Sequence, residues 1–388
     1  MRGRKQPEAL NTVLFDRYLF RNLGIATLFV AGVLICVVLL TQSMRFLELV
    51  VNSGASSGAF WMLALLALPR FLEIILPIAV MAGVVFVYNK MAMDSELIIM
   101  RATGASPLAL SRPALLLSAL VAVVLWITVM WLAPVSLSNM YKLRQVIQTQ
   151  YSSLLFREGV FNPVGNGLTV YMRERDGGGG LHGLMIHDMR PQNKTPVTIL
   201  ARRGTLLSTP QGQQVVVYEG SRQALDSKTG ALNRLDFDKY TIDLPDNAAA
   251  ASSRWRDPDE RTFPELFHPT KEDLLDPANA REFFIEINRR IVSPLLAPGF
   301  AVVALACLLL GQTDRRGQGW RIALATGITI AMEGLYLSCL NLSRHSDAGL
   351  VILYLLTLLP LLCGIFLLSP AGETFRRRLF FGRKRGRA

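Results

Sequence analysis

Six long apolar segments constrain the fold of this chain more than any other feature of its sequence. A helix needs about 20 predominantly apolar residues to cross the hydrocarbon core of a bilayer. Segments of that kind lie at residues 22–42, 60–88, 107–133, 291–311, 320–342 and 348–369. Pro69 and Pro77 fall in the second segment, so we expect a kink or tilt there. The pattern predicts an α-helical polytopic membrane protein and excludes a purely soluble enzyme, a disordered chain and a fibrous repeat.

A polar block separates the third and fourth apolar segments. It divides the chain into an N-terminal membrane half, an aqueous domain with its linker and a C-terminal membrane half, at residues 1–136, 137–288 and 289–388. Short strand candidates recur in the aqueous domain between turn-forming residues, which favours an antiparallel, jellyroll-like sandwich or open barrel. They lie at residues 156–161, 168–175, 181–190, 196–209, 213–225 and 232–244. Residues 245–276 predict a linker with little regular structure, and a helix from residue 277 leads into the fourth segment.

The net charge of +12 is carried by the membrane halves. Residues 137–288 hold 18 Lys and Arg against 19 Asp and Glu, whereas the rest of the chain holds 23 against 10. With the N-terminus in the cytoplasm, the cytoplasmic segments hold 18 basic residues, and the short loops on the opposite side hold only Arg45 and Arg344. Because basic residues concentrate in cytoplasmic loops, we expect both termini in the cytoplasm and the large polar domain in the periplasm. Topology thus explains the charge, and no nucleic-acid partner is expected.

Sequence motifs for catalysis are absent. The chain has no Gly-Lys dipeptide, so it cannot match a Walker A loop, and it has no HExxH motif. Its four cysteines all fall within the apolar segments, at positions 36, 307, 339 and 363. We therefore expect no catalytic residue, no metal site, no cofactor and no ATP hydrolysis by the chain itself.

The segment YNKMAMDSELIIMRATGAS, residues 88–106, mixes apolar and charged residues between the second and third spans. Asp94 or Ser95 can cap a short helix here, and Gly104 can end it. We expect this helix at about residues 91–103 to dock on a partner ATPase, although an ordinary interfacial helix would have the same pattern. Its candidate coupling residues are Glu96, Leu97, Met100 and Arg101.

Five cations flank the spans on the side opposite the cytoplasm. They are Arg45 after the first span, Lys142 and Arg144 after the third, and Arg289 and Arg290 before the fourth. Positive charge on this side runs against the usual bias, and an anionic head group, phosphate above all, would explain it. Simple flanking of the spans is the alternative.

Arg70, Glu73 and Glu333 are charged residues well inside the apolar segments. Arg70 and Glu73 are three residues apart and share a helix face, and Glu333 lies midway along the fifth span. Intramembrane charges usually face a bundle interior or an aqueous cavity. These residues therefore fit either a transport role or a local structural pair.

The stretch SELIIMRATG, residues 95–104, resembles the coupling-helix motif of the LptF/LptG family, the transmembrane subunits of the lipopolysaccharide-export ABC transporter. The resemblance extends over nearly the whole chain, through the 3+3 spans, the β-rich insert and the Pro69 to Pro77 pattern. It implies that Glu96 contacts the ATPase, and that Arg45, Lys142 and Arg144 lie where the family carries cations for lipid phosphates. REGVF at 157–161 and EINRRI at 286–291 resemble the LptF type more than the LptG type.

The same resemblance implies a function and a set of partners. The chain would extract lipopolysaccharide from the bacterial inner membrane and pass it through a periplasmic β-jellyroll. Its partners would be an LptB-type ATPase dimer that uses the ATP, an LptG-type second permease, a single-span LptC-type jellyroll protein and an LptA-type bridge. The alternatives are a permease of another lipid or lipoprotein export system, a lipid-modifying enzyme, and a non-transporting, membrane-anchored periplasmic scaffold.

Overall fold

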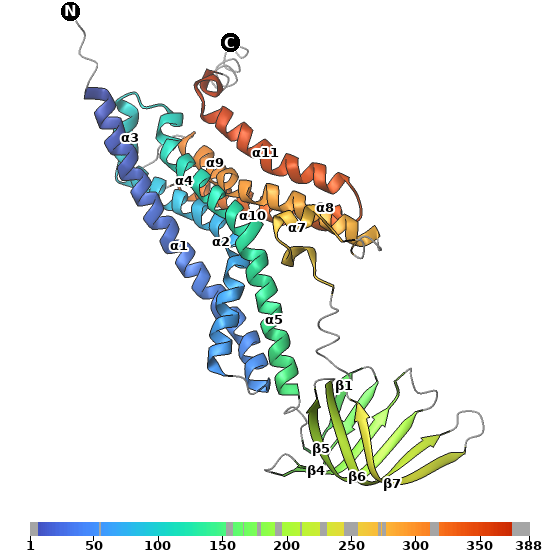
Figure 1. Ribbon diagram of the computed structural model, residues 1–388. Helices are drawn as coiled ribbons and strands as arrows, with labels where there is room; N and C mark the ends of the chain where they lie inside the picture. Colours follow the sequence, from blue (N-terminus) through green and yellow to red (C-terminus); the bar gives the residue numbers. More distant parts are fainter. Residues whose placement is uncertain are drawn as a thin grey trace, which may run out of the picture. The chain divides into compact units, whose positions relative to one another are not determined.

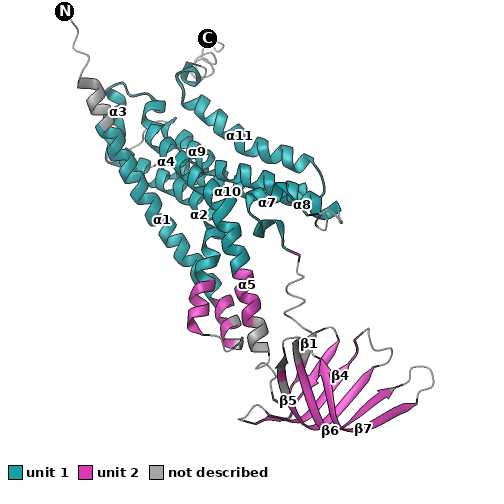
Figure 2. Cartoon of the chain, viewed as in Figure 1, with its two compact units in different colours: residues 1–43, 64–139, 256–388 teal, residues 44–63, 140–255 magenta. Residues whose placement is uncertain are grey.

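In a computed structural model the chain forms two compact units, which Figure 2 distinguishes by colour. One unit is helical and comprises residues 1–43, 64–139 and 256–388; the other comprises residues 44–63 and 140–255 and contains the β-sheet. The structure describes residues 7–53, 56–152, 158–165, 167–176, 180–190, 196–209, 212–225, 231–243, 255–270, 273, 277–310 and 318–374.

Among the residues that the structure describes, six helices are long and apolar enough to span a membrane (Figure 1). They are α1 (Pro7–Ser53), α2 (Ser57–Met93), α4 (Pro107–Ile127) continued by the π-helical η1 (Thr128–Leu132) and α5 (Ala133–Ser152), α8 (Pro277–Val292) continued by the 3-10 turn η3 (Ser293–Leu295) and α9 (Leu296–Leu309), α10 (Gly319–Ser343), and α11 (Ala348–Leu368). The six predicted spans are confirmed, and α2 runs unbroken through Pro69 and Pro77. The helices outrun the predicted segments because the hydrogen-bond ladder continues into polar residues that a search for apolar runs does not include.

The fourth span lies at the centre of the helical unit. Of its most apolar stretch 67% is buried, against 17% for the first span. Phe300, Ala301 and Ala304 on α9 are fully buried in a core that also includes residues of α2, α4, α10 and α11. The neighbours of α9 are therefore mainly protein, whereas much of α1 is exposed.

In the described part of the insert between the third and fourth spans, seven strands form an antiparallel sheet. Its strands are β1 (Phe161–Gly165), β2 (Leu168–Tyr171), β3 (Glu174–Arg175), β4 (Gly180–Asp188), β5 (Val197–Thr209), β6 (Gly212–Leu225) and β7 (Leu232–Asp243). Their order is β1-β2-β4-β5-β6-β7, with β3 beside β4. The predicted all-β insert is confirmed.

The prediction of a first strand at residues 156–161 was wrong for residues 158–160, which the structure describes. Residues 158–160 form a turn and a bend, and β1 begins at Phe161 and contains the Asn162-Pro163 pair that we expected in a turn. β1 is an edge strand, where a proline without an N–H group is tolerated because one side of the strand has no partner.

One face of the sheet carries its apolar core, which includes Val170, Ile199, Val215 and Val217. Core-facing and outward-facing residues do not alternate strictly along β4. Leu181 and Leu184 on β4 are three residues apart, yet both are buried in this core. Gly183 between them adopts a positive φ of 66°, a conformation that suits glycine. The strand pairing skips Gly183, so Leu181 and Leu184 face the same side of the sheet although they are three residues apart.

The segment before α8 is more ordered than we expected from its composition. Its described residues form the 3-10 turn η2 (Pro258–Glu260) and the short helix α7 (Phe263–Phe267). The carboxylate of Glu265 accepts a hydrogen bond from the Thr262 backbone N–H at 3.1 Å, which holds the start of α7. The expectation of little regular structure was therefore wrong for residues 258–267, whereas the helix start at residue 277 is confirmed.

Candidate functional site

The segment between the second and third spans contains a helix of seven residues, α3 (Glu96–Ala102). Gly104 ends it, as predicted, with a φ of 89° and hydrogen bonds from the N–H groups of Gly104 and Ala105 to the carbonyls of Arg101 and Met100. The predicted side-chain cap is not formed. Ser95 occupies the N-cap position with a φ of 61°, and its hydroxyl makes no capping hydrogen bond.

Three of the predicted coupling residues face the helical bundle. Leu97 is 0% exposed and belongs to the main core, and Met100 packs against that core. The Arg101 guanidinium donates a hydrogen bond of 2.5 Å to the carbonyl of Leu309 at the end of α9. Burial and the neighbouring Arg321 lower the pKa of Arg101. These residues therefore fix α3 to the bundle.

The outward side of this segment carries other residues. Met93, Asp94 and Ile99 are exposed, and Glu96 is partly exposed at the first position of α3. Glu96 is the first residue of α3, and among the four predicted coupling residues it is the one on the outward side of the segment. The ATPase contact that we expected of Glu96, Leu97, Met100 and Arg101 stays a prediction.

Arg289 and Arg290 lie in a buried ion-pair network on α8. Arg289 donates to both carboxylate oxygens of Glu73 at 2.6 and 2.7 Å, and to Glu286 at 2.7 and 2.8 Å. Arg290 is 1% exposed and donates to the same Glu286 carboxylate at 2.6 Å. Both arginines that we expected to bind phosphate are thus paired with carboxylates. A lipid phosphate would have to displace these carboxylates.

Arg290 also holds the segment that precedes α8. Its guanidinium donates to the carbonyls of Arg261, Pro258 and Asp259 at 2.7, 3.1 and 3.3 Å. This segment is therefore tied to the helical unit through backbone groups of η2 and the residue after it.

Arg261 makes a second attachment in this segment. It forms a two-pronged pair with Asp273 at 2.6 and 2.7 Å, and its guanidinium lies 4.9 Å from the Phe283 ring of α8. The Arg261 guanidinium holds the pKa of Asp273 well below its usual range. The pair therefore contributes stability above the ordinary carboxyl pKa and loses it as the pH falls through the lowered value.

Arg70 and Glu73 share a face of α2 but do not pair with each other in the described part of the chain. Arg70 pairs with Asp259 of η2 at 2.8 Å, and Glu73 pairs with Arg289 of α8. A local pair was therefore the wrong expectation, because each side chain connects α2 to a different element.

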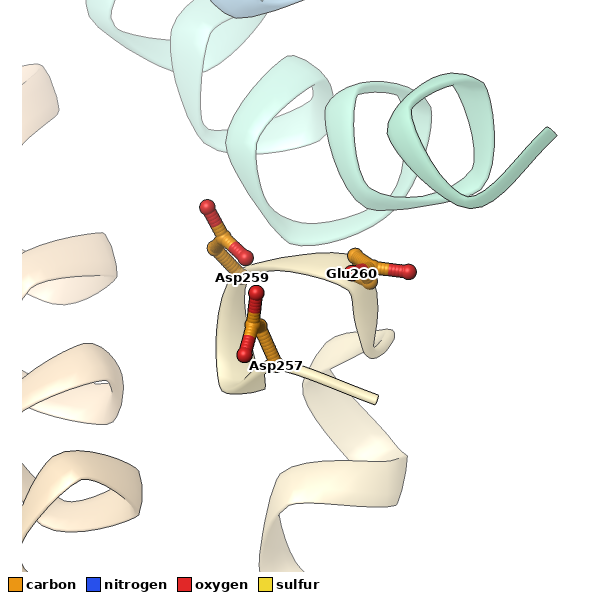
Figure 3. A group of neighbouring side chains, drawn as sticks. All are labelled: Asp257, Asp259 and Glu260. Atoms are coloured by element: carbon orange, nitrogen blue, oxygen red, sulfur yellow. The ribbon is translucent and has the colours of Figure 1, made fainter. Parts of the chain in front are cut away.

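Three carboxylates of η2 lie close enough together to raise the question of a metal site (Figure 3). One oxygen from each of Asp257, Asp259 and Glu260 lies within 4.8 Å of the others. Asp259 is already paired with Arg70, however, and Asp257 is exposed to solvent. Arg70 thus already takes up one of the three carboxylates.

The other predicted cations belong to the second unit, with Arg45 on α1 and Lys142 and Arg144 near the middle of α5. Arg45 and Lys142 are exposed. The Arg144 guanidinium lies 5.3 Å from the centre of the buried Phe46 ring, a distance typical of a cation–π contact. Arg45 and Lys142 are thus accessible, Arg144 is half-buried against Phe46, and Arg289 and Arg290 are largely buried on α8.

Glu333 on α10 lies beside the buried network. It lines a cavity of about 730 Å³ together with Arg70, Glu73 and Glu286. In the described part of the chain, no basic side chain forms an ion pair with it. Glu286, Asp259 and Ser293 also line this cavity, and the sequence did not draw attention to them. The sequence signal that could have identified Glu286 is its position three residues before Arg289 and four before Arg290.

Comparison with known proteins decides the family. The family model described as lipopolysaccharide export system permease LptF/LptG matches residues 17–370, nearly the whole chain. The chain belongs to this family. It is therefore a multi-pass membrane protein of the LptF/LptG family, whose members are transporter permeases and not enzymes themselves.

The relatives of this LptF/LptG permease are distant. An uncharacterized protein of Rickettsia prowazekii is 24% identical over 359 residues, which cover 92% of this chain and 98% of that protein. The lipopolysaccharide export system permease proteins LptF of Escherichia coli K12 and Shigella flexneri are each 25% identical over 240 residues, 61% of this chain and 66% of theirs. The chain thus matches just under two thirds of the LptF relatives.

Proposed function

We propose that the chain is an LptF-type subunit of an ABC transporter that extracts lipopolysaccharide from the bacterial inner membrane. The family match over residues 17–370 carries this proposal. Both termini lie in the cytoplasm and the sheet lies in the periplasm. The chain binds no cofactor, because ATP is hydrolysed by a separate LptB-type dimer.

The proposed partners follow from the same role. An LptG-type permease completes the membrane part, and an LptC-type jellyroll and an LptA-type bridge receive the lipid from the sheet. The acyl chains must stay out of water during this transfer, because each exposed CH₂ group costs about 0.8 kcal/mol. The apolar core of the sheet, which includes Leu181 and Leu184, would supply the sheltering side chains.

Purification of the tagged chain from its own membranes tests the proposal. An ATPase and a second six-span protein should co-purify in stoichiometric amounts, and lipopolysaccharide should stimulate the ATPase. Stimulation by another lipid or by lipoproteins, but not by lipopolysaccharide, would favour a different export system. A chain that purifies alone would favour the membrane-anchored scaffold.

The accessible cations Arg45 and Lys142 are proposed to contact the lipid phosphates. A charge-assisted hydrogen bond contributes about 1.5–3 kcal/mol, so Arg45→Glu and Lys142→Glu should each weaken lipopolysaccharide binding at least about tenfold in the reconstituted complex. Stability should stay unchanged, because both side chains are exposed.

Two further variants separate lipid recognition from other effects of charge. Arg290→Glu should destabilise the helical unit, since Arg290 is buried among carbonyls and Glu286. Lys239→Glu reverses an exposed charge on β7 and should leave binding at the wild-type value. If Arg45→Glu and Lys142→Glu bind lipid as well as Lys239→Glu does, the outer cations serve topology alone.

A further inference from the structure

The cavity beside Glu333 collects polar groups from three elements of the helical unit. Glu333 and Tyr336 come from the middle of α10, Ser293 from η3 and Glu73 from α2. Its volume of about 730 Å³ lies within the range of small-molecule sites in proteins. The cavity is therefore large enough for a ligand group and not only for a bound water.

The charges of this cavity do not balance. Arg289 pairs with Glu73 and Glu286, and Arg70 pairs with Asp259. Glu333 has no such partner among the described residues, although it lies midway along a membrane-spanning helix. An unpaired carboxylate at that depth is costly, so the site favours a positively charged occupant.

Two buried hydroxyl groups line the same cavity. Tyr336 is 4% exposed and Ser293 is 1% exposed; their hydroxyls lie close enough to interact with each other, and neither forms a hydrogen bond to any other side chain in the described part of the chain. Buried polar groups in proteins are nearly always hydrogen-bonded. Glu333 thus presents an unpaired carboxylate to one space, and the hydroxyl oxygens of Tyr336 and Ser293 can still accept hydrogen bonds there.

A primary ammonium group matches this set. It carries a positive charge and three N–H donors and has no acceptor, so one carboxylate and two hydroxyl oxygens can satisfy it. A proton on Glu333 would remove the charge but would supply one O–H donor, whereas an ammonium group supplies three N–H donors. A quaternary ammonium group would supply charge without N–H donors.

The margin of the cavity indicates how such a group can enter. Ile74 of α2 and Leu337 of α10 line it and are exposed on membrane-spanning helices, so apolar surface leads to the polar interior. An amine attached to a lipid can enter along that surface with its acyl chains outside, whereas a soluble amine would enter past the polar side chains of Asp257 and Arg344.

We propose that Glu333, Tyr336 and Ser293 form a binding site for a primary ammonium group. The site is independent of the proposed export of lipopolysaccharide, because it rests on the side chains of one helical unit. The test uses the full-length chain in nanodiscs that contain equal amounts of phosphatidylethanolamine and phosphatidylcholine. Native mass spectrometry then measures which lipid the protein retains.

The primary amine should be retained over the quaternary one by at least about tenfold, the ratio that one charge-assisted hydrogen bond produces. Glu333→Gln should abolish this preference and Tyr336→Phe should reduce it, which also covers the case in which one variant fails to fold. Glu282→Gln is the matched control, because Glu282 is an exposed carboxylate at the same cavity.

A second arm distinguishes a lipid from a soluble amine. Ethylammonium chloride is added to the protein in phosphatidylcholine nanodiscs, and thermal stabilisation is compared with that by tetramethylammonium chloride. Stabilisation by ethylammonium alone that Glu333→Gln abolishes, with no lipid preference, supports the site and assigns it to soluble amines. Equal retention of both lipids together with no ethylammonium effect, or effects that persist in Glu333→Gln, overturns the proposal.

Discussion

Replacing Glu286 by alanine is expected to cost the helical unit about 3–5 kcal/mol of unfolding free energy, because it removes one side of a buried charge network. Glu286 accepts hydrogen bonds from both Arg289 and Arg290. Without it, Arg290 keeps only backbone carbonyls, although its side chain is almost completely buried. The loss should appear as a large decrease in the midpoint of thermal unfolding in nanodiscs.

Glu265→Ala provides the matched control for this prediction. Glu265 also pairs with an arginine, Arg256 at 3.5 Å, but both side chains are 47% exposed. The exposed ion pair contributes about 0–1 kcal/mol and the hydrogen bond to the Thr262 N–H about 0.5–2 kcal/mol, so this variant should lose clearly less stability than Glu286→Ala. Equal midpoints for Glu286→Ala and Glu265→Ala would show that the network does not hold α8 in place.

Replacing Glu96 by lysine is expected to weaken association with the ATPase at least about a hundredfold. Breaking one side of a buried interfacial charge pair costs about 3–5 kcal/mol, and each 1.4 kcal/mol is a factor of ten. Because Glu96 is partly exposed and makes no described ion pair within this chain, the stability of the permease alone should change little. Co-purification of the ATPase and ATP hydrolysis by the complex measure the two effects.

Asp94→Lys and Leu97→Ala distinguish the possible causes of a weakened association. Asp94 is an exposed acid two residues earlier, so its reversal tests whether charge in the segment suffices. Leu97 is buried in the permease core, and its truncation should cost about 2–5 kcal/mol of stability. If Asp94→Lys impairs association as much as Glu96→Lys does, the specific role of Glu96 is excluded.

The sequence predicted those elements whose signal is local and long. Twenty apolar residues identify a span by themselves, and strands β4 to β7 follow from turn residues at regular spacing. Pro163 misled the prediction of β1, because whether a proline sits in a turn or on a sheet edge depends on strand order. That order is not a local property of the chain.

The candidate site was less accessible to sequence reasoning for the same reason. Glu73 pairs with a residue 216 positions away, and Arg70 with one 189 positions away. Spacing along α2 suggested that the two would pair with each other, since only near neighbours are visible in one sequence. Similarly, α3 has seven residues, too few for its periodicity to show that Leu97 faces inward.

The central claim is that lipopolysaccharide travels along the apolar face of the sheet in an ATP-dependent step. Photo-crosslinking in the reconstituted complex tests it most directly, with the photoreactive residue at Val215 or Val217 on that face. Leu200 and Leu207, exposed on the opposite face of β5, are the matched positions. The account predicts capture of lipopolysaccharide at Val215 and Val217 that requires ATP hydrolysis, and none at Leu200 or Leu207. Capture only at the outer positions, or equal capture without ATP, would contradict it.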